Sequence, residues 1–583
     1  MQRLINNSQF AICKTSASPL TKGLCLLLIA YCLLITTSCK HTPELYVPQD
    51  FEVTVVVDSI PGGTRHIAIN DNGDLYVKVM VPGHGANIAL RDTNGDSRAD
   101  IIKPFGQYKE LGRYGTAMRI YNGYLYYSTA LMIYRSKLIK GQLLPDEAMD
   151  TIVIDDHEHG MHEHNAKPVT FDESGHIFVP FGGPSNACQV YNRTPFSVGI
   201  DPCPLLENHA GIWRFDANKK NQTQKDGYKY ATGLRSLLAI EWNELDHKLY
   251  TVMHGRDDLL RLWPNKFSPW QSALLPSEEF LRIDEGSNSG WPYCYYDQMQ
   301  HKKVLAPEYG GDGKIIGRCD TFNNPIIGFP GHWAPNDIFF YTGDQFPERY
   351  KNGAFISFHG ATNRAPYPQS GYFIGFVPYT NGTFDTTFEV FADGFARVDP
   401  IVNVSDAVYR PMGIAMGPDG SMYFADSETG RIWKVTYKGD KKNFGKDKLA
   451  EMEKRKLASN IRTPDIITDD LDRNNRDAAA VGEKTYTVYC GACHQKNGMG
   501  ASGRFPTLAS DWVSGDKSKL INVVLKGLEG DIQVNKEIFN GTMPKHDFLK
   551  DEDIAAILTY IRKSFGNNAD AVKAEEVKAE RGK

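Results

Sequence analysis

The sequence predicts an all-β domain built as a six-bladed β-propeller, followed by a small all-α domain. Two observations predict this order. Units of strand, turn and strand recur across several hundred residues with little helical periodicity between them. The C-terminal part instead carries apolar residues at helical spacing, most clearly between Asp551 and Phe565. With 41% hydrophobic residues the chain can bury a large core, and a net charge of −5 without a basic stripe argues against a nucleic-acid partner.

Three hairpin units carry the repeat. Each consists of an apolar strand, a turn that contains glycine and a second strand rich in β-branched or aromatic residues. The units cover residues 65–77, 167–179 and 410–423, and residues 238–250 are a looser copy. Six blades of about 65 residues would fill the region 43–437. An array of β-sandwiches is the alternative architecture.

The first 38 residues predict export. A basic segment precedes the apolar run Leu24–Ile35, which is too short to span a bilayer and has the size of a signal-peptide core. The run ends in Thr36-Thr37-Ser38-Cys39, which resembles a bacterial lipoprotein cleavage site. We therefore expect a lipoprotein signal peptide at 1–38, a lipid anchor on Cys39 and a membrane-anchored protein that faces the periplasm. Lys40 favours the outer membrane, and an ordinary secretory signal is the alternative.

Near the other end, Cys490-Gly491-Ala492-Cys493-His494 is the pattern that attaches a c-type haem. Two thiols on one helical turn reach the two vinyl groups, and the adjacent histidine becomes an axial ligand of the iron. A thioredoxin-like pair would not need the histidine, and a zinc site would need another Cys/His pair nearby. Met543, in a turn ahead of the last amphipathic segment, is the expected sixth ligand. Met499 and His546 are its alternatives.

The segment 476–566 resembles the class I cytochrome c domains that are fused to periplasmic dehydrogenases. The resemblance rests on Tyr489, Cys490, Cys493, His494, Gly498, Gly500, Phe505-Pro506-Thr507-Leu508, Gly541, Met543-Pro544 and Thr559-Tyr560-Ile561. It implies a haem c that transfers electrons to an external acceptor, with residues 505–508 along one haem edge. The charge-rich stretch 438–475 is expected to be a linker with one solvated helix, and the Ala/Lys/Glu-rich tail 567–583 is expected to be disordered.

Four further cysteines lie in the large region, at Cys188, Cys203, Cys294 and Cys319. An even number in an exported protein predicts two disulfides. Proximity makes Cys188–Cys203 and Cys294–Cys319 the simplest pairs, although three pairings are possible.

The region 43–437 resembles the glucose/sorbosone, or aldose sugar, dehydrogenases, which are six-bladed propellers that hold pyrroloquinoline quinone (PQQ) and oxidise sugars. The resemblance is carried by Arg65-His66, the His164 loop, Gly233-Leu234-Arg235, His254-Gly255-Arg256-Asp257, Gly290-Trp291-Pro292-Tyr293, Phe340-Tyr341-Thr342-Gly343 and Tyr409-Arg410-Pro411-Met412-Gly413. It implies the following roles: His164 as catalytic base, Arg235, Arg410 and His254 at the PQQ, and the carbonyls of Gly255 and Arg256 on a calcium ion.

These residue types suit the chemistry. An alcohol that loses a hydride also needs a base to take its hydroxyl proton, and guanidinium groups bind carboxylates such as those of PQQ through two hydrogen bonds. The sequence departs from glucose-oxidising members at Ser236 and Leu238, where an asparagine and a glutamine are expected, and at His254, where a glutamine is expected. These changes fit sorbosone-like or aldose-like members better. A metal cluster of the histidines in 157–164 and structural salt bridges of the arginines are the alternatives.

A second calcium site is a further candidate. Side-chain oxygens alternate along Asp92, Asn94, Asp96 and Asp100, but the closing glutamate of an EF-hand is missing. A plain hairpin turn explains this stretch equally well.

The sequence as a whole predicts an all-β six-bladed β-propeller followed by a small all-α cytochrome c domain. As a function it predicts a membrane-anchored quinohaemoprotein dehydrogenase. PQQ and calcium would serve the oxidation of a sugar, a polyol or a related alcohol or aldehyde, and the chain's own haem c would collect the electrons. A propeller that binds carbohydrate or protein without PQQ is the main alternative, and a lactonase-type hydrolase is the third reading.

Overall fold

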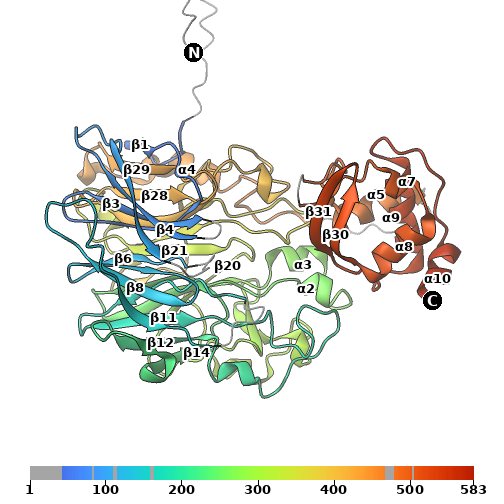
Figure 1. Cartoon of the computed structure of the whole chain (residues 1–583), viewed down its shortest axis with the longest axis horizontal. Helices are drawn as coiled ribbons and strands as arrows, with labels where there is room; N and C mark the ends of the chain where they lie inside the picture. Colours follow the sequence, from blue (N-terminus) through green and yellow to red (C-terminus); the bar gives the residue numbers. More distant parts are fainter. Residues whose placement is uncertain (1–42, 82–83, 109–114, 158–162, 467–477, 502–503) are drawn as a thin grey trace, which may run out of the picture. The chain divides into compact units, whose positions relative to one another are not determined.

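The computed structural model describes residues 43–81, 84–108, 115–157, 163–466, 478–501 and 504–583 (Figure 1). The expected signal peptide and the lipidation site Cys39 lie outside these residues. Within the described ranges, no helix combines the length and the apolar character needed to cross a membrane.

Six sheets, each built around four antiparallel strands, form the large domain among the described residues, so the predicted six-bladed propeller is confirmed. The first three blades are β2–β5 (Thr64–Ile69, Leu75–Val81, His84–Arg91, Ile101–Tyr108), β6–β9 (Met118–Tyr121, Tyr124–Ser128, Met132–Lys137, Asp150–Ile154) and β10, β11, β12 and β14 (Thr170–Phe171, His176–Phe181, Gly211–Asp216, Tyr228–Thr232). A short strand β13 (Gln222–Thr223) joins the second blade in parallel with β9.

The other three blades continue in chain order. They are β15, β16, β17 and β20 (Leu237–Asn243, Lys248–Met253, Glu278–Ile283, Ile327–Phe329), β21, β22, β23 and β26 (Pro335–Phe340, Ala354–Phe358, Phe373–Val377, Glu389–Ala392) and β27, β28 and β29 (Pro411–Met416, Met422–Asp426, Ile432–Tyr437) with β1 (Phe51–Val57). First strands of neighbouring blades contact one another in the pairs β2–β6, β10–β15, β15–β21, β21–β27 and β27–β2, which places these strands around the centre of the ring.

The ring is closed by a strand from the start of the domain. β1 pairs antiparallel with β29, and Phe51 lies opposite Tyr437 (Figure 1). Phe51 also contacts the rings of Phe346 and Phe391 edge-on, at centroid distances of 4.8 and 5.2 Å. Such aromatic pairs stabilise beyond the area that they bury. The closure therefore joins residues almost 400 positions apart through both backbone and side-chain contacts.

The expected linker differs from the structure over most of its length. Helix α4 (Ala450–Arg455) packs on the propeller, where Met452 and Ile461 lie in one apolar cluster with the core of the fifth blade. Arg455 pairs with the buried Asp393. Within α4 only Met452 is buried, and Ala450, Glu451, Glu453 and Lys454 are exposed, so the expected solvated helix is present but is attached to the propeller by one apolar side chain. Residues 467–475 of the expected linker lie outside the described part.

The C-terminal domain is mainly helical. Its helices are α5 (Ala478–Tyr489), α6 (Gly491–His494), α7 (Asp511–Ser514), α8 (Lys517–Lys526), α9 (Asp551–Lys563) and α10 (Ala574–Arg581), with a hairpin of β30 (Leu528–Val534) and β31 (Glu537–Met543) between α8 and α9. The predicted apolar face of α9 is buried. Gly482 of α5 lies so close to α9 that a Cβ there would be 2.2 Å from the carbonyl oxygen of Ala556.

Two features of this domain differ from the expectation. The hairpin β30–β31 is an addition to an all-α domain. The tail, expected to be disordered, forms α10, whose Val577 is fully buried with Val572 in the domain core. Arg581 also bonds to Asp551 at 2.7 Å. A single valine on a charged helix gives too weak a periodic signal to predict this packing from composition.

Candidate active site and haem pocket

His164 is held with one nitrogen anchored and the other available. It follows a stretch outside the described residues and has a φ of +59°, in the left-handed region. Nδ1 lies 2.6 Å from the carbonyl oxygen of Gly183. That oxygen can only accept, so we assign the proton to Nδ1, which leaves a lone pair on Nε2. Burial and the charge of Arg235 lower the pKa of His164, so the ring is neutral.

Arg235 ties together the loops beside this histidine. The side chain is buried and donates from Nε and Nη2 to the main-chain and side-chain oxygens of Asn186, at 3.1 and 2.9 Å. Nη1 donates to the carbonyl of Gly255 at 2.8 Å, and Nη2 pairs with Asp257 at 2.8 Å. The loops after β11, β14 and β16 are thereby fixed to one guanidinium group.

His254 follows β16 in the fourth blade, and Arg410 directly precedes β27 in the sixth. Nε2 of His254 bonds to the carbonyl of Pro335 at 2.8 Å, and burial lowers the pKa of His254 to about 4. Arg410 contacts His359 through Nη2 and Nδ1 at 2.9 Å and pairs with Glu428 at 3.3 Å.

His359 was not predicted from the sequence. Burial first, and then the charges of Arg410 and Arg65, hold the pKa of His359 well below its usual value, and His254 lowers it further. On the other side of the site, burial and then the charge of Arg235 lower the pKa of both His164 and His254. Main-chain hydrogen bonds from Gly183 to Arg235 and from His254 to Ser236, at 2.7 and 3.0 Å, bring His164, Arg235 and His254 together. The individual roles of these residues and of Arg410 stay predictions. A histidine directly after the fully buried strand β22 was the available signal for His359.

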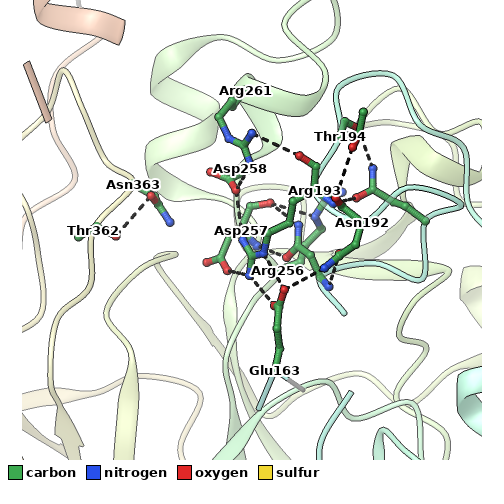
Figure 2. Close-up of polar contacts among 12 residues, drawn as sticks. Glu163, Asn192, Arg193, Thr194, Arg256, Asp257, Asp258, Arg261, Thr362 and Asn363 are labelled. Atoms are coloured by element: carbon green, nitrogen blue, oxygen red, sulfur yellow. Dashed lines mark hydrogen bonds and ion pairs between the residues drawn. The ribbon is translucent and has the colours of Figure 1, made fainter. Parts of the chain in front are cut away.

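A charged network at this site was also missed (Figure 2). Arg193 bonds through two nitrogens to Glu163, at 2.7 and 2.9 Å, and pairs with Asp257 at 3.0 Å and Asp258 at 3.2 Å. Arg261 in turn bonds to Asp258 at 2.7 Å. These residues come from loops far apart in the chain, so no local sequence pattern predicts their contacts.

The two disulfides of the structure are Cys188–Cys203 and Cys294–Cys319, the pairs expected from proximity. Both lie in one apolar cluster with Trp291, which also donates through Nε1 to the carbonyl of Asn186 at 3.0 Å. The disulfide-bonded segments therefore form the wall behind the Asn186–Arg235 contact.

The expected calcium sites receive no support from side-chain geometry. Across the described ranges, no group of three or more His, Cys, Asp or Glu side chains could hold a metal ion. The carbonyl of Gly255 accepts from Arg235, and the Arg256 side chain pairs with Glu308 at 2.6 Å.

In the loop 92–100 the backbone amides already use the side-chain oxygens. Asp92 accepts from the amides of Asn94, Gly95 and Ser97, and Asp100 accepts from the amide of Thr93. This geometry is the one that the plain-turn alternative predicts. Calcium therefore stays a prediction. The histidine-rich stretch 158–162 lies outside the described part of the chain.

The C-terminal domain contains a cavity of about 390 Å³. It is lined by Cys490, Cys493, His494 and Met543, by Arg504 and by residues 505–508, the stretch that the resemblance implied. Residues of the hairpin β30–β31 also line it. Nδ1 of His494 bonds to the carbonyl of Pro506 at 2.9 Å, which leaves Nε2 for a metal. Met499 is 56% exposed, whereas Met543 lines the cavity.

Comparison with known proteins assigns both domains. A family profile described as TrAA12-like matches residues 45–438, more than half of the chain. The chain belongs to the TrAA12-like family. A second profile, described as cytochrome c, matches residues 479–564, so the predicted haem c domain is confirmed.

Solved structures share the fold of this TrAA12-like propeller. A Trichoderma reesei carbohydrate-active enzyme of family AA12 is 19% identical, with a TM-score of 0.55 over 68% of this chain and 98% of that one. The holo PQQ domain of a pyranose dehydrogenase from Coprinopsis cinerea is 16% identical, with a TM-score of 0.52 over 68% and 97%.

The curated relatives that match by sequence include the following two. Cytochrome c-552 of Thermus thermophilus is 43% identical over 117 residues, which is 18% of this chain and 78% of the relative. A pyrroloquinoline quinone-dependent sugar dehydrogenase of Hypocrea jecorina is 22% identical over 226 residues, which is 36% of this chain and 49% of the relative. The chain thus joins a propeller of the TrAA12-like family to an electron-transfer cytochrome c domain.

Proposed function

We propose that the propeller oxidises a sugar or a related alcohol or aldehyde with PQQ, and that the electrons pass singly to the chain's own haem c. The observation that carries the proposal is the state of His164. Its Nδ1 is fixed on Gly183 and its Nε2 is an unprotonated acceptor, in a buried site beside Arg235. A neutral imidazole held in this way is a general base that can act at neutral pH.

The donor chemistry of the site fits a quinone with three carboxylates. Arg410 and Arg235 would hold carboxylates, and His254 would contribute a further contact to the cofactor. Each guanidinium now donates to protein acceptors, so a carboxylate would have to replace Glu428 at Arg410, or Asp257 at Arg235. Glu428 is 44% exposed, and exposed ion pairs contribute little to stability, so its replacement costs little.

The proposed reaction divides between cofactor and protein. When bound, PQQ would supply the electrophilic carbonyl that accepts the hydride. His164 would accept the hydroxyl proton at Nε2, while the Nδ1–H bond to Gly183 keeps the ring oriented. Because burial and Arg235 disfavour the charged imidazole, the proton would leave the site readily in the next step.

In the C-terminal domain, Cys490 and Cys493 would bind the haem covalently and His494 would ligate the iron through Nε2. Met543 would be the sixth ligand, since a thioether raises the iron potential and favours electron uptake. An external acceptor, such as another cytochrome, would then reoxidise the haem.

The proposals on substrate and location rest on the relatives and on the sequence before Cys39. The names of the relatives, a pyranose dehydrogenase and a sugar dehydrogenase, favour a sugar. The sequence before Cys39 favours export and a lipid anchor, with the protein facing the periplasm and the outer membrane preferred over the inner one because of Lys40. Calcium would assist PQQ through the main-chain oxygens of Gly255 and Arg256, as the resemblance implies.

The bonded state of both arginines also fits the alternative of a propeller that binds carbohydrate or protein without PQQ. The deciding experiment adds PQQ and calcium to the purified holocytochrome and follows the haem spectrum under anaerobic conditions. Haem reduction that requires both PQQ and an added aldose supports the proposal. A haem that dithionite reduces, but that no aldose reduces with PQQ present, contradicts it.

A further inference from the structure

The loop closed by the disulfide Cys188–Cys203 carries Arg193. Figure 2 shows this arginine among Glu163, Asp257 and Asp258. Arg193 has a φ of +54°, and its amide donates to the side-chain oxygen of Gln189 at 2.9 Å. An arginine is rare in this backbone conformation. These features fix the backbone at Arg193, and with it the direction in which the side chain leaves the loop.

The partner of Arg193 is the residue that precedes the catalytic base. Nε and Nη2 of Arg193 bind the two oxygens of Glu163 at 2.9 and 2.7 Å, and Asn192 donates to Glu163 at 2.9 Å. Burial alone would raise the pKa of Glu163, but the contacts with Arg193 lower it, so the carboxylate is charged. The same guanidinium is fixed from the other side by Asp257 and Asp258.

The Glu163 carboxylate can also compete with the substrate hydroxyl for Nε2 of His164. Its Oε2 lies 3.6 Å from Nε2 of His164, the nitrogen that would take the substrate proton. This distance is longer than a hydrogen bond, and a small rotation of the carboxylate would close it. A carboxylate bonded to Nε2 would favour the imidazolium and would occupy the position of the substrate hydroxyl.

We propose that Arg193 is a positioning residue that holds the Glu163 carboxylate off Nε2 of His164, so that this nitrogen remains an open proton acceptor. The inference deepens the proposed function and rests on it for its catalytic consequence. The placement of the three side chains, however, can be tested without PQQ or substrate.

Other charged groups act on His164 as well. Among the described residues, Arg235 lowers the pKa of His164, whereas Asp257 raises it. Arg235 is fixed by Asn186 and Gly255 as well as by Asp257, so the loss of Arg193 should leave it in place. Glu163 is therefore the group whose position depends most directly on Arg193.

The test measures the titration of His164 in the full chain without PQQ. The protein carries isotope-labelled histidines, and the His164 resonance is assigned by its loss in His164→Asn. In Arg193→Gln the released carboxylate should raise the pKa of His164 by at least about one unit. The double variant Glu163→Gln/Arg193→Gln should return it to the wild-type value, because an amide cannot stabilise the imidazolium by charge.

Arg261→Gln is the matched control, since Arg261 bonds to Asp258 and to the carbonyl of Arg193 but not to Glu163 in the structure. It should leave the titration unchanged. In the loaded enzyme, the acid limb of the kcat/KM profile should move up in pH for Arg193→Gln and return in the double variant.

An unchanged His164 titration in Arg193→Gln, or a shift that persists in the double variant, would overturn the positioning role. A shift in the titration without any aldose-driven haem reduction in wild type would instead place the failure in the proposed function. Circular dichroism of each variant separates both outcomes from misfolding, and Arg193→Lys, which keeps the charge, should show a smaller shift than Arg193→Gln.

Discussion

Arg119 and Asp337 form an ion pair at the centre of the propeller, with Nη2 and Oδ1 2.8 Å apart and the Asp337 carboxylate fully buried. They lie on β6 and β21, the first strands of the second and fifth blades. Glu241 on β15 lies 3.4 Å from the same guanidinium, and the second oxygen of Asp337 accepts from the amide of Ile414 at 2.9 Å. One buried network therefore joins four blades.

Loss of one partner of this pair should destabilise the propeller strongly. Asp337→Ala would leave the Arg119 charge buried without its main partner and the amide of Ile414 without its acceptor. We expect the free energy of unfolding to fall by about 3–5 kcal/mol, measured by denaturant titration. The exposed pair Arg98–Asp58 provides the control, since Asp58→Ala should have little effect. An equal loss of the free energy of unfolding in Asp337→Ala and Asp58→Ala would contradict a larger stabilising role of the central pair.

Glu278 should give the stability a dependence on pH. Burial raises the pKa of this carboxyl group from 4.5 to about 8, although it accepts from the amide of Gly255. The folded state thus binds a proton that the unfolded state releases near pH 4.5, and stability should fall between about pH 4.5 and 8. Glu278→Gln should match wild type at pH 4 and exceed it at pH 8 by at least about 1 kcal/mol. Parallel stability curves for the two proteins would exclude this titration.

Met543→Ala should keep the haem covalently bound, since Cys490 and Cys493 are untouched. Its reduction potential should fall, because a soft thioether ligand is lost. The weak sulfur-to-iron absorption band of the oxidised protein should disappear as well. Spectroelectrochemistry checks both, with Met499→Ala as the matched control because Met499 is exposed. If the band and the reduction potential of Met543→Ala are those of wild type, another residue is the sixth ligand, and His546 is the next candidate.

Cys39→Ala should remove the lipid anchor. The protein should then move from the membrane fraction to the soluble fraction or stay unprocessed, and labelling with a fatty-acid analogue should be lost. Cys25→Ala, within the apolar run, is the control and should be processed normally. Normal processing with unchanged membrane attachment in Cys39→Ala would remove the lipoprotein reading.

The two domains could be predicted because their signals are local. The glycine turns of the hairpins recur along the chain, and Cys490, Cys493 and His494 lie within one helical turn. The network around Arg193 could not be predicted, because Glu163 and Asp257 lie 30 and 64 residues away and meet only when separate blades align. Charges in a loop are usually solvated, so composition alone gave no reason to pair them.

The two helices whose packing was not predicted from the sequence, α4 and α10, were also missed for lack of a local pattern. Met452 in α4 and Val577 in α10 are single apolar residues on charged helices, and each is buried. Sequence periodicity needs several apolar positions before it predicts a buried face. One side chain that enters an existing core leaves no such pattern.

The central claim is that His164 takes the substrate proton while Arg235 and Arg410 hold PQQ. The most direct measurement compares wild type with His164→Ala and Arg410→Ala, loaded with PQQ, by the rate of haem reduction after an aldose is mixed in. We expect His164→Ala to bind PQQ nearly normally and to reduce its haem about 10²–10⁴-fold more slowly. Arg410→Ala should bind PQQ weakly and regain activity with excess cofactor. A His164→Ala protein with the full rate, or a wild type that binds no PQQ, would contradict the account.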